Sequence, residues 1–171
     1  MAVQNYLTNF VQGIFNAVKA ISGVRIHYMQ NTIAKAAADN DTSTYLVFKN
    51  IPGTFKIKNL YVENDALAGG TSWSLQLYDS DLGTAKGSSL SGVMDFSAAH
   101  KKGIHTTAAN VALDGIASLT HAQTLQCLYE IAGDTLSANG MKNKYDLVLV
   151  GTTVGGAAGS ITVRGEFIPA G

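Results

Sequence analysis

The feature that most constrains this chain is a series of short stretches in which apolar and polar residues alternate. The clearest is Trp73–Leu77, where tryptophan and leucine alternate with serine and glutamine. Successive side chains of a β-strand point to opposite faces, so a period of two places the apolar side chains on one face and the polar ones on the other. Three other stretches have the length and composition of strands: Tyr45–Lys49, Tyr145–Val150 and Ile161–Ile168. Together these stretches predict a protein built mainly from strands.

Turn-forming residues separate the predicted strands. Ile51-Pro52-Gly53 and Ala68-Gly69-Gly70 are typical of turns, and Gly151–Gly159 is expected to connect two strands of a hairpin. The alternation that begins at Phe55 shifts at Asn59-Leu60, as a β-bulge would cause. Short strands with glycine turns, and no regular alternation with helices, predict an all-β fold: an antiparallel β-sandwich, preferably closed as a jelly roll.

The remaining segments of this part of the chain carry weaker patterns. Val24–Tyr28 alternates and is expected to be the first strand, and Ala34–Thr44 suits a flexible polar loop or a short helical turn. Leu82–Gly103 is rich in glycine, serine and alanine and predicts a long surface excursion. Two segments stay open: Ala108–Leu119 suits a short strand or a turn, and Leu125–Ile131 suits a strand or a helix. Asp134–Lys144 is expected to be a polar loop.

The beginning of the chain has a different period. From Val3 to Ile21 apolar residues recur every three or four positions, as on one face of an amphipathic helix. Gly23 follows, and glycine often ends a helix. We expect a helix over residues 2–22. The chain then divides into an N-terminal helical arm with the first strand, residues 1–33, and a β-sandwich domain, residues 34–171.

The apolar stripe of this helix has two possible partners. It packs on its own domain, or it mediates self-association or docking into a larger assembly, and the sequence leaves both readings open. The polar face is rich in amides and almost uncharged, so binding to a membrane surface is not expected. The candidate assembly contacts are Leu7, Phe10, Ile14, Val18 and Ile21.

Composition limits the kinds of partner. The chain has 171 residues, with 12 basic and 12 acidic side chains, so a broad electrostatic grip on nucleic acid or anionic lipid is excluded. Only 14% of residues are charged, against about 25% in a typical soluble domain. A surface with few charges provides little electrostatic repulsion between copies of a protein. We therefore expect a component of an assembly, with part of its surface covered by other subunits.

The cysteine and the histidines form no recognisable catalytic pattern. Cys127 is the only cysteine, which excludes an intrachain disulfide and a multi-cysteine zinc site. It lies in an apolar stretch and is interpreted as a small core residue, although His121 could be imagined as its base. His100 and His105 lie in a lysine-rich stretch at a spacing that does not match a helical zinc pair. They are interpreted as solvated loop residues.

Acidic residues gather at three places: Asp39-Asn40-Asp41, Glu63-Asn64-Asp65 and Asp79-Ser80-Asp81. Oxygen ligands of this kind hold calcium, but none of the three matches a full calcium loop, and aspartate and asparagine are common in turns. Trp73 is in phase with the apolar positions of its strand, which places it in the core. We expect no catalytic residues, no cofactor and no metal.

Part of the chain resembles a known family. The stretches that carry the resemblance are KIKNLYVEND after Ile51-Pro52, GGTSWSLQLYD from Gly69, LYEIAG from Leu128, YDLVL from Tyr145, and GSITV from Gly159. In this order they resemble small β-sandwich structural proteins that are encoded beside capsid and head genes in tailed bacteriophages. Residues 2–22 and 82–119 depart from the family's pattern.

The resemblance implies a virion structural protein, either a capsid decoration (cement) protein or a head-fibre component, assembled in the host cytoplasm. Its partners would be the major capsid protein or another virion protein and copies of itself, with a trimer expected. No catalytic residues are implied. The alternative is a receptor- or glycan-binding module of a phage fibre, using the loop around Gly87–Gly92 and exposed tyrosines such as Tyr78.

Overall fold

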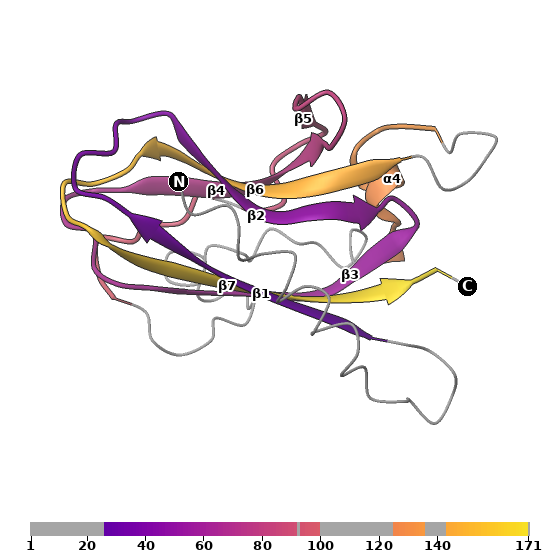
Figure 1. Ribbon diagram of the computed structural model, residues 1–171, viewed down its shortest axis with the longest axis horizontal. Helices are drawn as coiled ribbons and strands as arrows, with labels where there is room; N and C mark the ends of the chain where they lie inside the picture. Colours follow the sequence, from indigo (N-terminus) through magenta and orange to yellow (C-terminus); the bar gives the residue numbers. More distant parts are fainter. Residues whose placement is uncertain (1–25, 92, 100–124, 136–142, 171) are drawn as a thin grey trace.

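The computed structural model describes residues 26–91, 93–99, 125–135 and 143–170. Its strands form two antiparallel sheets that face each other in two layers (Figure 1). Sheet A contains three strands in the order β1-β7-β3, and sheet B contains four in the order β2-β6-β4-β5. The expectation of an all-β, sandwich-like fold is confirmed.

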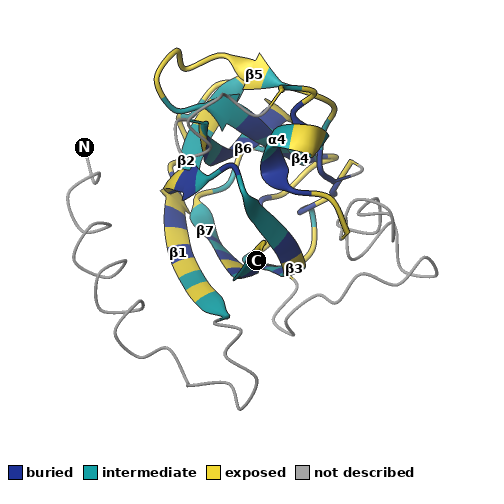
Figure 2. Ribbon diagram, turned by 90° about the vertical axis from the view of Figure 1, so that its right-hand side faces the viewer, coloured by how far each residue is buried: buried dark blue, intermediate teal, exposed yellow. Residues whose placement is uncertain are grey.

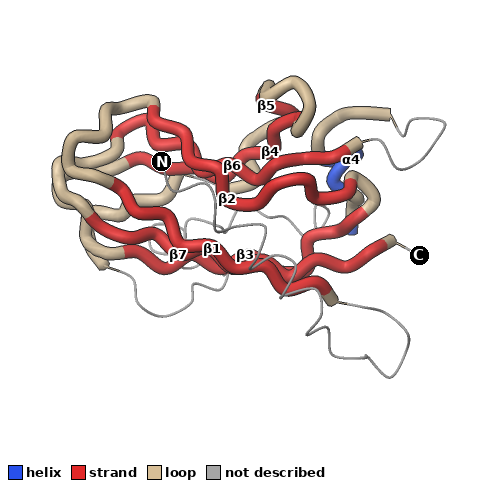
Figure 3. Tube along the Cα trace, viewed as in Figure 1, coloured by secondary structure: helices blue, strands red, loops and turns tan. Residues whose placement is uncertain are grey.

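The strands of each sheet come from distant parts of the chain. Sheet A consists of β1 (His27–Lys35), β3 (Phe55–Asn64) and β7 (Gly159–Pro169). Sheet B consists of β2 (Ser43–Pro52), β4 (Ser72–Asp79), β5 (Ala85–Lys86) and β6 (Lys144–Thr153). A short helix, α4 (Leu128–Ile131), lies at one end of the sandwich. In Figure 3 the strands run along both layers and the loops gather at the ends.

The core fills the space between the inner faces of the sheets. In β4, Trp73, Leu75 and Leu77 are each at most 1% exposed, as their alternation predicts. The Trp73 ring lies 5.7 Å from the rings of both Tyr45 and Phe96. Figure 2 shows exposed residues alternating with buried and half-buried ones along β1, as expected for a strand with one face towards the core. The prediction that Trp73 belongs to the core is confirmed.

Most strands belong to the other sheet than the strand before them in the chain, so the hairpin expected at Gly151–Gly159 is not formed. Gly151–Gly159 does not close a hairpin, because β6 belongs to sheet B and β7 to sheet A. Gly155 lies in this crossing with a φ of +79°, and a Cβ there would come within 2.5 Å of the Leu67 carbonyl oxygen. The hairpin prediction was wrong because a glycine-rich connection does not encode which sheet the next strand enters.

The first strand also differs from its expected bounds. β1 pairs with β7 from His27 to Lys35, so it continues past Tyr28 into the stretch expected to be a loop or a short helical turn, whereas Val24 lies outside the described residues. The error has a physical cause: Asn31 and Lys35 are polar yet buried, which breaks the alternation. Asn31 Nδ2 donates to the Val47 carbonyl at 3.0 Å, and Lys35 Nζ donates to two carbonyls, at 2.8 and 3.0 Å.

The boundary predicted between residues 33 and 34 falls inside β1. The expected helix over residues 2–22 lies outside the described residues, together with its candidate contacts.

The predicted surface excursion is partly a core segment. Leu90, Met94 and Phe96 are 0%, 2% and 1% exposed. Met94 forms a β-bridge with Trp73, and the Leu90 N–H donates to the Leu75 carbonyl at 2.8 Å. The prediction was wrong for these residues because single apolar side chains spaced among glycine and serine show no period.

Three smaller expectations were close to the structure. The shift in β3 lies between Ile57 and Asn59, next to the predicted bulge. The turn after β3 has positive φ at Ala68 and Gly69, as its sequence indicates. The ambiguous stretch that ends at Ile131 contains both kinds of structure: Cys127 forms a β-bridge with Lys56, and α4 follows directly.

Candidate interaction surfaces

The two sheets present outer faces of different chemistry. On sheet A, Arg164 lies in the central strand β7, opposite Gln30 of β1 and Tyr61 of β3. Its guanidinium contacts Glu63 Oε1 at 3.0 Å and donates to Gln30 Oε1 at 3.0 Å. The row beside it is also charged or polar. The outer face of sheet A therefore carries both signs of charge.

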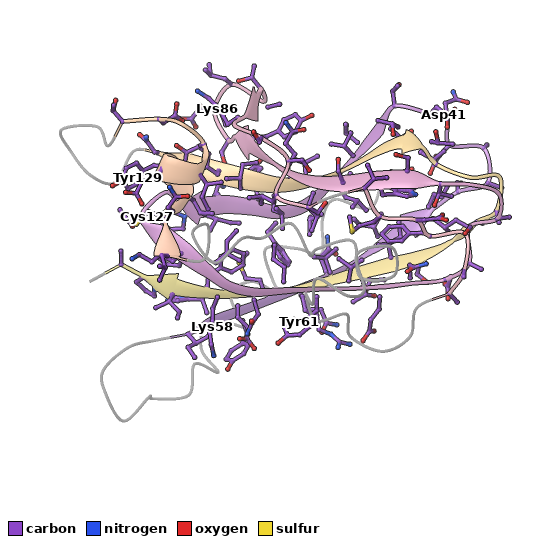
Figure 4. The ribbon with its side chains drawn as sticks, turned by 180° about the vertical axis from the view of Figure 1, so that it is seen from behind. Asp41, Lys58, Tyr61, Lys86, Cys127 and Tyr129 are labelled. Carbon is purple, nitrogen blue, oxygen red and sulfur yellow. The ribbon has the colours of Figure 1, made fainter. Side chains whose placement is uncertain are left out.

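A second group on this face is centred on Glu166. Asn59 Nδ2 donates to Glu166 Oε2 at 2.6 Å, and Lys58 Nζ lies 3.4 Å from the same oxygen. In Figure 4, Lys58 and Tyr61 point away from the sandwich on this side. Exposed ion pairs of this kind contribute at most about 1 kcal/mol each, since water competes for both partners. This face is suited to contact with solvent.

The outer face of sheet B contains two rows without charge. Thr44, Val150 and Ser74 lie side by side across β2, β6 and β4. Leu46, Val148 and Gln76 form the next row. We call these six residues the sheet B patch. It consists of aliphatic, hydroxyl and amide side chains only.

Val148 is the centre of the sheet B patch. It is 6% exposed, yet it lies outside the cluster of core side chains, whereas its strand neighbours Leu147 and Leu149 belong to that cluster. Its side chain therefore lies on the outer face, flanked by Leu46 and Gln76. Another protein can cover an uncharged sheet face at small desolvation cost, because no charge has to leave water.

Charge returns at one end of the patch. Asp146 of β6 lies opposite Tyr78 of β4. Its Oδ1 accepts a hydrogen bond from the Asn50 N–H at 2.8 Å and another from the Ser80 hydroxyl. The carboxylate therefore fastens the ends of β2 and β4 to β6. Tyr78, a candidate of the glycan-binding alternative, is only half-buried.

A polar depression of about 360 Å³ lies where the β4–β5 turn meets the start of β6. Lys86 Nζ is 3.1 Å from Asp134 Oδ1 and 4.0 Å from Asp79 Oδ2. The Tyr145 hydroxyl donates to Asp134 Oδ2 at 2.7 Å. This hydrogen bond lowers the pKa of Asp134, and burial followed by the same bond raises the pKa of Tyr145. The Asp134 carboxylate is thus already held by donors of the chain.

The acidic clusters hold turns together. Asp39 Oδ2 accepts from the Ala36 N–H at 2.8 Å and the Tyr45 hydroxyl at 2.6 Å, and Asp41 Oδ1 accepts from the Val154 N–H at 2.9 Å. The bond from Tyr45, and then the one from Ala36, lower the pKa of Asp39. Burial, and then the bond to Asp39, raise the pKa of Tyr45 to about 12.

Asp65 and Asp79, like Asp39 and Asp41, accept hydrogen bonds from backbone N–H groups of the turns and strand ends beside them. Asp65 Oδ2 accepts from the Ser160 N–H at 2.9 Å, and Asp79 Oδ1 accepts from the N–H groups of Asp81 and Leu82. Within the described ranges, no group of three or more His, Cys, Asp or Glu side chains is placed to hold a metal ion. The turn interpretation of these clusters therefore agrees with their contacts.

The cysteine is structural. Cys127 is 8% exposed and precedes α4, where its N–H donates to Glu130 Oε2 at 2.6 Å. Burial, and then the Glu130 charge, raise the pKa of its thiol, which makes the thiolate nucleophile scarce at neutral pH. Figure 4 shows it beside Tyr129 at the end of the sandwich. His27 lies in β1 against the Phe55 ring at 4.9 Å, and the other three histidines fall outside the described residues.

The predicted assembly contacts and the observed patch come from different parts of the chain. Leu7, Phe10, Ile14, Val18 and Ile21 all lie outside the described residues. The sheet B patch was missed, because Leu46, Val148 and Val150 read as ordinary members of fully buried strands. The sequence signal that could have indicated the patch lies in β4, where the uncharged Ser74 and Gln76 alternate with core residues.

No protein-family model, curated protein or solved structure matches the chain. Among the residues that the structure describes, no helix has the length and apolar character needed to cross a bilayer.

Proposed function

We propose that this protein is a structural component of a tailed-bacteriophage virion, a capsid decoration (cement) or head-fibre protein that binds the particle and stabilises it. The observation that carries the proposal is the sheet B patch, six neighbouring residues with aliphatic, hydroxyl and amide side chains and no charge. The resemblance of the strand stretches to such proteins supports it. The low charge of the whole chain, 14% of residues, is what a subunit with covered surface needs.

The mechanism is passive. Covering apolar surface contributes roughly 25 cal/mol per Å², and a standard interface buries about 1,600 Å² in total. Repeated over many copies, such contacts hold neighbouring subunits together without any chemical step. The partners are the major capsid protein or another virion protein, and copies of this chain arranged as a homo-oligomer, with a trimer as our first expectation. Leu7, Phe10, Ile14, Val18 and Ile21 remain proposed contacts of an N-terminal helical arm.

The strand order favours a jelly roll as the finer description of the fold. A jelly roll of eight strands places them in two sheets, in the orders 1-8-3-6 and 2-7-4-5. If the sixth strand is left out and the later ones renumbered, the orders become 1-7-3 and 2-6-4-5. The two sheets here have this order. The jelly roll is an architecture that viral capsid proteins use.

A matched pair of charge insertions tests the role of the patch. Gln76→Lys places a cation within the sheet B patch, and Thr32→Lys places one on the outer face of sheet A, where Thr32 is exposed. An unpaired charge covered by a partner costs about 3–5 kcal/mol, so Gln76→Lys should weaken particle binding by about 100-fold or more. Thr32→Lys should leave binding unchanged. Equal occupancy of both variants on purified particles would remove the patch from the mechanism.

Deletion of residues 1–22 tests the arm separately. Its loss should reduce binding or oligomer size if the apolar stripe reaches a neighbouring subunit. Unchanged occupancy and unchanged mass by light scattering would remove the arm from the mechanism and leave the patch.

The polar depression favours a second candidate, a receptor- or glycan-binding module of a phage fibre. Carboxylate, ammonium and amide groups line it, and such groups bind sugar hydroxyls. A glycan array with the isolated protein tests this function. Binding that is lost on Lys86→Ala would favour it over a purely structural role.

A further inference from the structure

Two tyrosines lie on the outer face of sheet A, beside the charged residues described above. Tyr28 of β1 is 50% exposed and is the most exposed of the tyrosines that the structure describes. Tyr61 of β3 is half-buried and lies between the buried Leu60 and Val62, so its side chain is on the outer face. In Figure 4 it points away from the sandwich. This face therefore offers aromatic surface as well as charge.

The strand register places the two tyrosines on a diagonal of the sheet. Tyr28 lies opposite Glu166 of β7, and Tyr61 lies opposite Arg164, which is two residues away on the same strand. Two strand spacings across the sheet and two residues along it give about 12 Å between the two tyrosine Cα atoms. Glu166 and Arg164 lie between them. A short chain of rings can therefore contact both tyrosines and the two charged groups at once.

The guanidinium of Arg164 has a fixed orientation on this face. Its Nη1 lies 3.0 Å from Glu63 Oε1, and its Nη2 donates to Glu63 Oε2 at 3.2 Å, which makes a two-point contact. Its Nε donates to Gln30 Oε1 at 3.0 Å. A guanidinium has five N–H donors, so these contacts leave one donor on each Nη atom for a ligand. The Arg164 side chain is 45% exposed, and a ligand in solution can reach these donors.

Glu166 supplies an oriented acceptor beside Tyr28. Its Oε2 accepts a hydrogen bond from Asn59 Nδ2 at 2.6 Å and lies 3.4 Å from Lys58 Nζ. Both contacts use the same oxygen, and a carboxylate has lone pairs on both oxygens. Oε1 of Glu166 can therefore accept a hydrogen bond from a ligand while Oε2 keeps its partners.

The charges of this face balance each other, and this favours a neutral ligand. Arg164 is paired with Glu63, and Lys58 is paired with Glu166. A charged ligand would have to compete with one member of a pair for the other. A neutral ligand with hydroxyl groups both donates and accepts, so it can bond to these groups without separating a pair. A sugar ring adds an apolar C–H side that packs on the apolar body of a tyrosine ring.

We propose that the outer face of sheet A binds a neutral oligosaccharide. Tyr28 and Tyr61 pack against its sugar rings, and Arg164 and Glu166 form hydrogen bonds with its hydroxyl groups. The site goes beyond the particle-binding role, which uses sheet B, and it is not the polar depression of the second candidate function. The oligosaccharide leaves the ion pairs intact and partly hydrated, so it avoids the desolvation cost that a protein partner would meet on this face. With sheet B against a particle, sheet A stays in water, where a sugar can reach it.

An array of neutral and anionic oligosaccharides probed with the full isolated chain tests the proposal, followed by titration of the neutral oligosaccharide that binds best. Tyr28→Ala should weaken its binding about 10-fold, because the packing against the ring is lost, whereas Tyr28→Phe should retain most of the affinity. Arg164→Ala should weaken it about 10-fold or more, since hydrogen bonds from a charged donor are lost. Val93→Ala is the matched control and should bind like the unmodified chain, because Val93 is 65% exposed and lies beside the bridge that Met94 forms with sheet B.

The outcomes separate this site from the surfaces proposed above. Glycan binding that is lost on Lys86→Ala and kept by Tyr28→Ala would overturn the site on sheet A and assign the ligand to the polar depression. The proposal would also be overturned if no neutral oligosaccharide bound, or if binding were confined to anionic ones. Loss of particle occupancy on Tyr28→Ala, with glycan binding unchanged, would make the face a protein contact instead. None of these results alters the expectation for Gln76→Lys, so the virion role stands or fails separately.

Amide NMR spectra of the unmodified chain give a second reading that needs no variant. Addition of the neutral oligosaccharide that binds best on the array should shift the resonances of Tyr28, Tyr61 and Arg164. Those of Val148 and Gln76 on sheet B should stay in place. Shifts confined to sheet B, or to the residues around the polar depression, would overturn the proposal even if every variant failed to fold.

Discussion

The outer faces of the two sheets rest on the same core but differ in their chemistry. On sheet A, Arg164 and Glu166 each contact partners on neighbouring strands through charged or amide groups. On sheet B, the residues at the corresponding central position, Val148 and Val150, have threonine, leucine, serine and glutamine beside them. The face of sheet A keeps its charges in water, whereas the six residues of the sheet B patch carry no charge, and the nearest carboxylate, Asp146, lies at one end of the patch.

This difference indicates how the molecule can be oriented in an assembly. Covering sheet A would remove ion pairs and their hydration, which costs more than the pairs return. Covering sheet B removes apolar and neutral polar surface and costs little. If the protein binds a particle or its own copies through a sheet, sheet B is therefore the side that faces the partner.

The largest expected effect separates the two faces of a single strand. Leu149→Ala should lower the free energy of unfolding by about 2–5 kcal/mol, because Leu149 is 0% exposed and its loss leaves a cavity. Val148→Ala, one residue away on the outer face, should cost clearly less in the isolated chain. Urea unfolding of both variants measures this contrast. Equal losses would mean that Val148 is a core residue and that the sheet B patch is not an interface.

The next effect concerns the side on which the two sheets are joined. Asn31→Ala removes the donor to the Val47 carbonyl and should lower the free energy of unfolding by about 1–3 kcal/mol, since a buried acceptor loses its partner. Asn31 is 7% exposed, so solvent cannot easily replace it. Thr32→Ala is the neighbouring control on the outer face, and a change as large there would contradict this interpretation.

A smaller effect is expected on the charged face. Arg164→Ala should cost about 0.2–1 kcal/mol, because its partners Glu63 and Gln30 remain exposed to water. The loss should shrink as salt is added, since exposed ion pairs are screened. Thermal unfolding of the variant and the unmodified chain at low and high salt measures this. A salt-independent loss above 2 kcal/mol would show that Arg164 supports packing.

The smallest effect lies outside both faces, at Asp95. The Ser97 N–H and then the Thr71 hydroxyl donate to this carboxylate and lower its pKa from 3.8 to about 2. A lowered pKa means that the folded state gains stability above pH 4 and loses it as the pH falls towards 2. Asp95→Asn should lack this acid-dependent part. The stability difference between the two proteins should be present at pH 6 and shrink as the pH falls from 4 through 2, and a constant difference would contradict the assignment.

Much of the strand content could be predicted from local pattern. Trp73–Leu77, Tyr145–Val150 and Ile161–Ile168 alternate or are continuously apolar, and all three form strands. The failures share one cause: β1 was misplaced because Asn31 and Lys35 are buried through hydrogen bonds to distant carbonyls, and such partners leave no periodic signal. Leu90 and Phe96 were assigned to the surface for a similar reason, since their contacts are with Leu75 and Trp73 of the distant strand β4.

The candidate surface was not predictable in the same way. Ser74 and Gln76 show that one side of β4 is polar, but whether that side carries charge depends on which strands lie beside it.

The sequence by itself determined that the described part of the chain consists mainly of β-strands, which residues of its alternating strands face the core, and that few charges are available for any surface. Only the tertiary structure decided which strands are neighbours, and therefore that Arg164 and Glu166 have charged or amide partners on sheet A, whereas the six neutral residues of the sheet B patch lie side by side. The physical reason is the separation of the residues along the chain. Alternation is a property of adjacent residues, whereas one sheet face contains residues of β2, β4 and β6, which are far apart in the sequence.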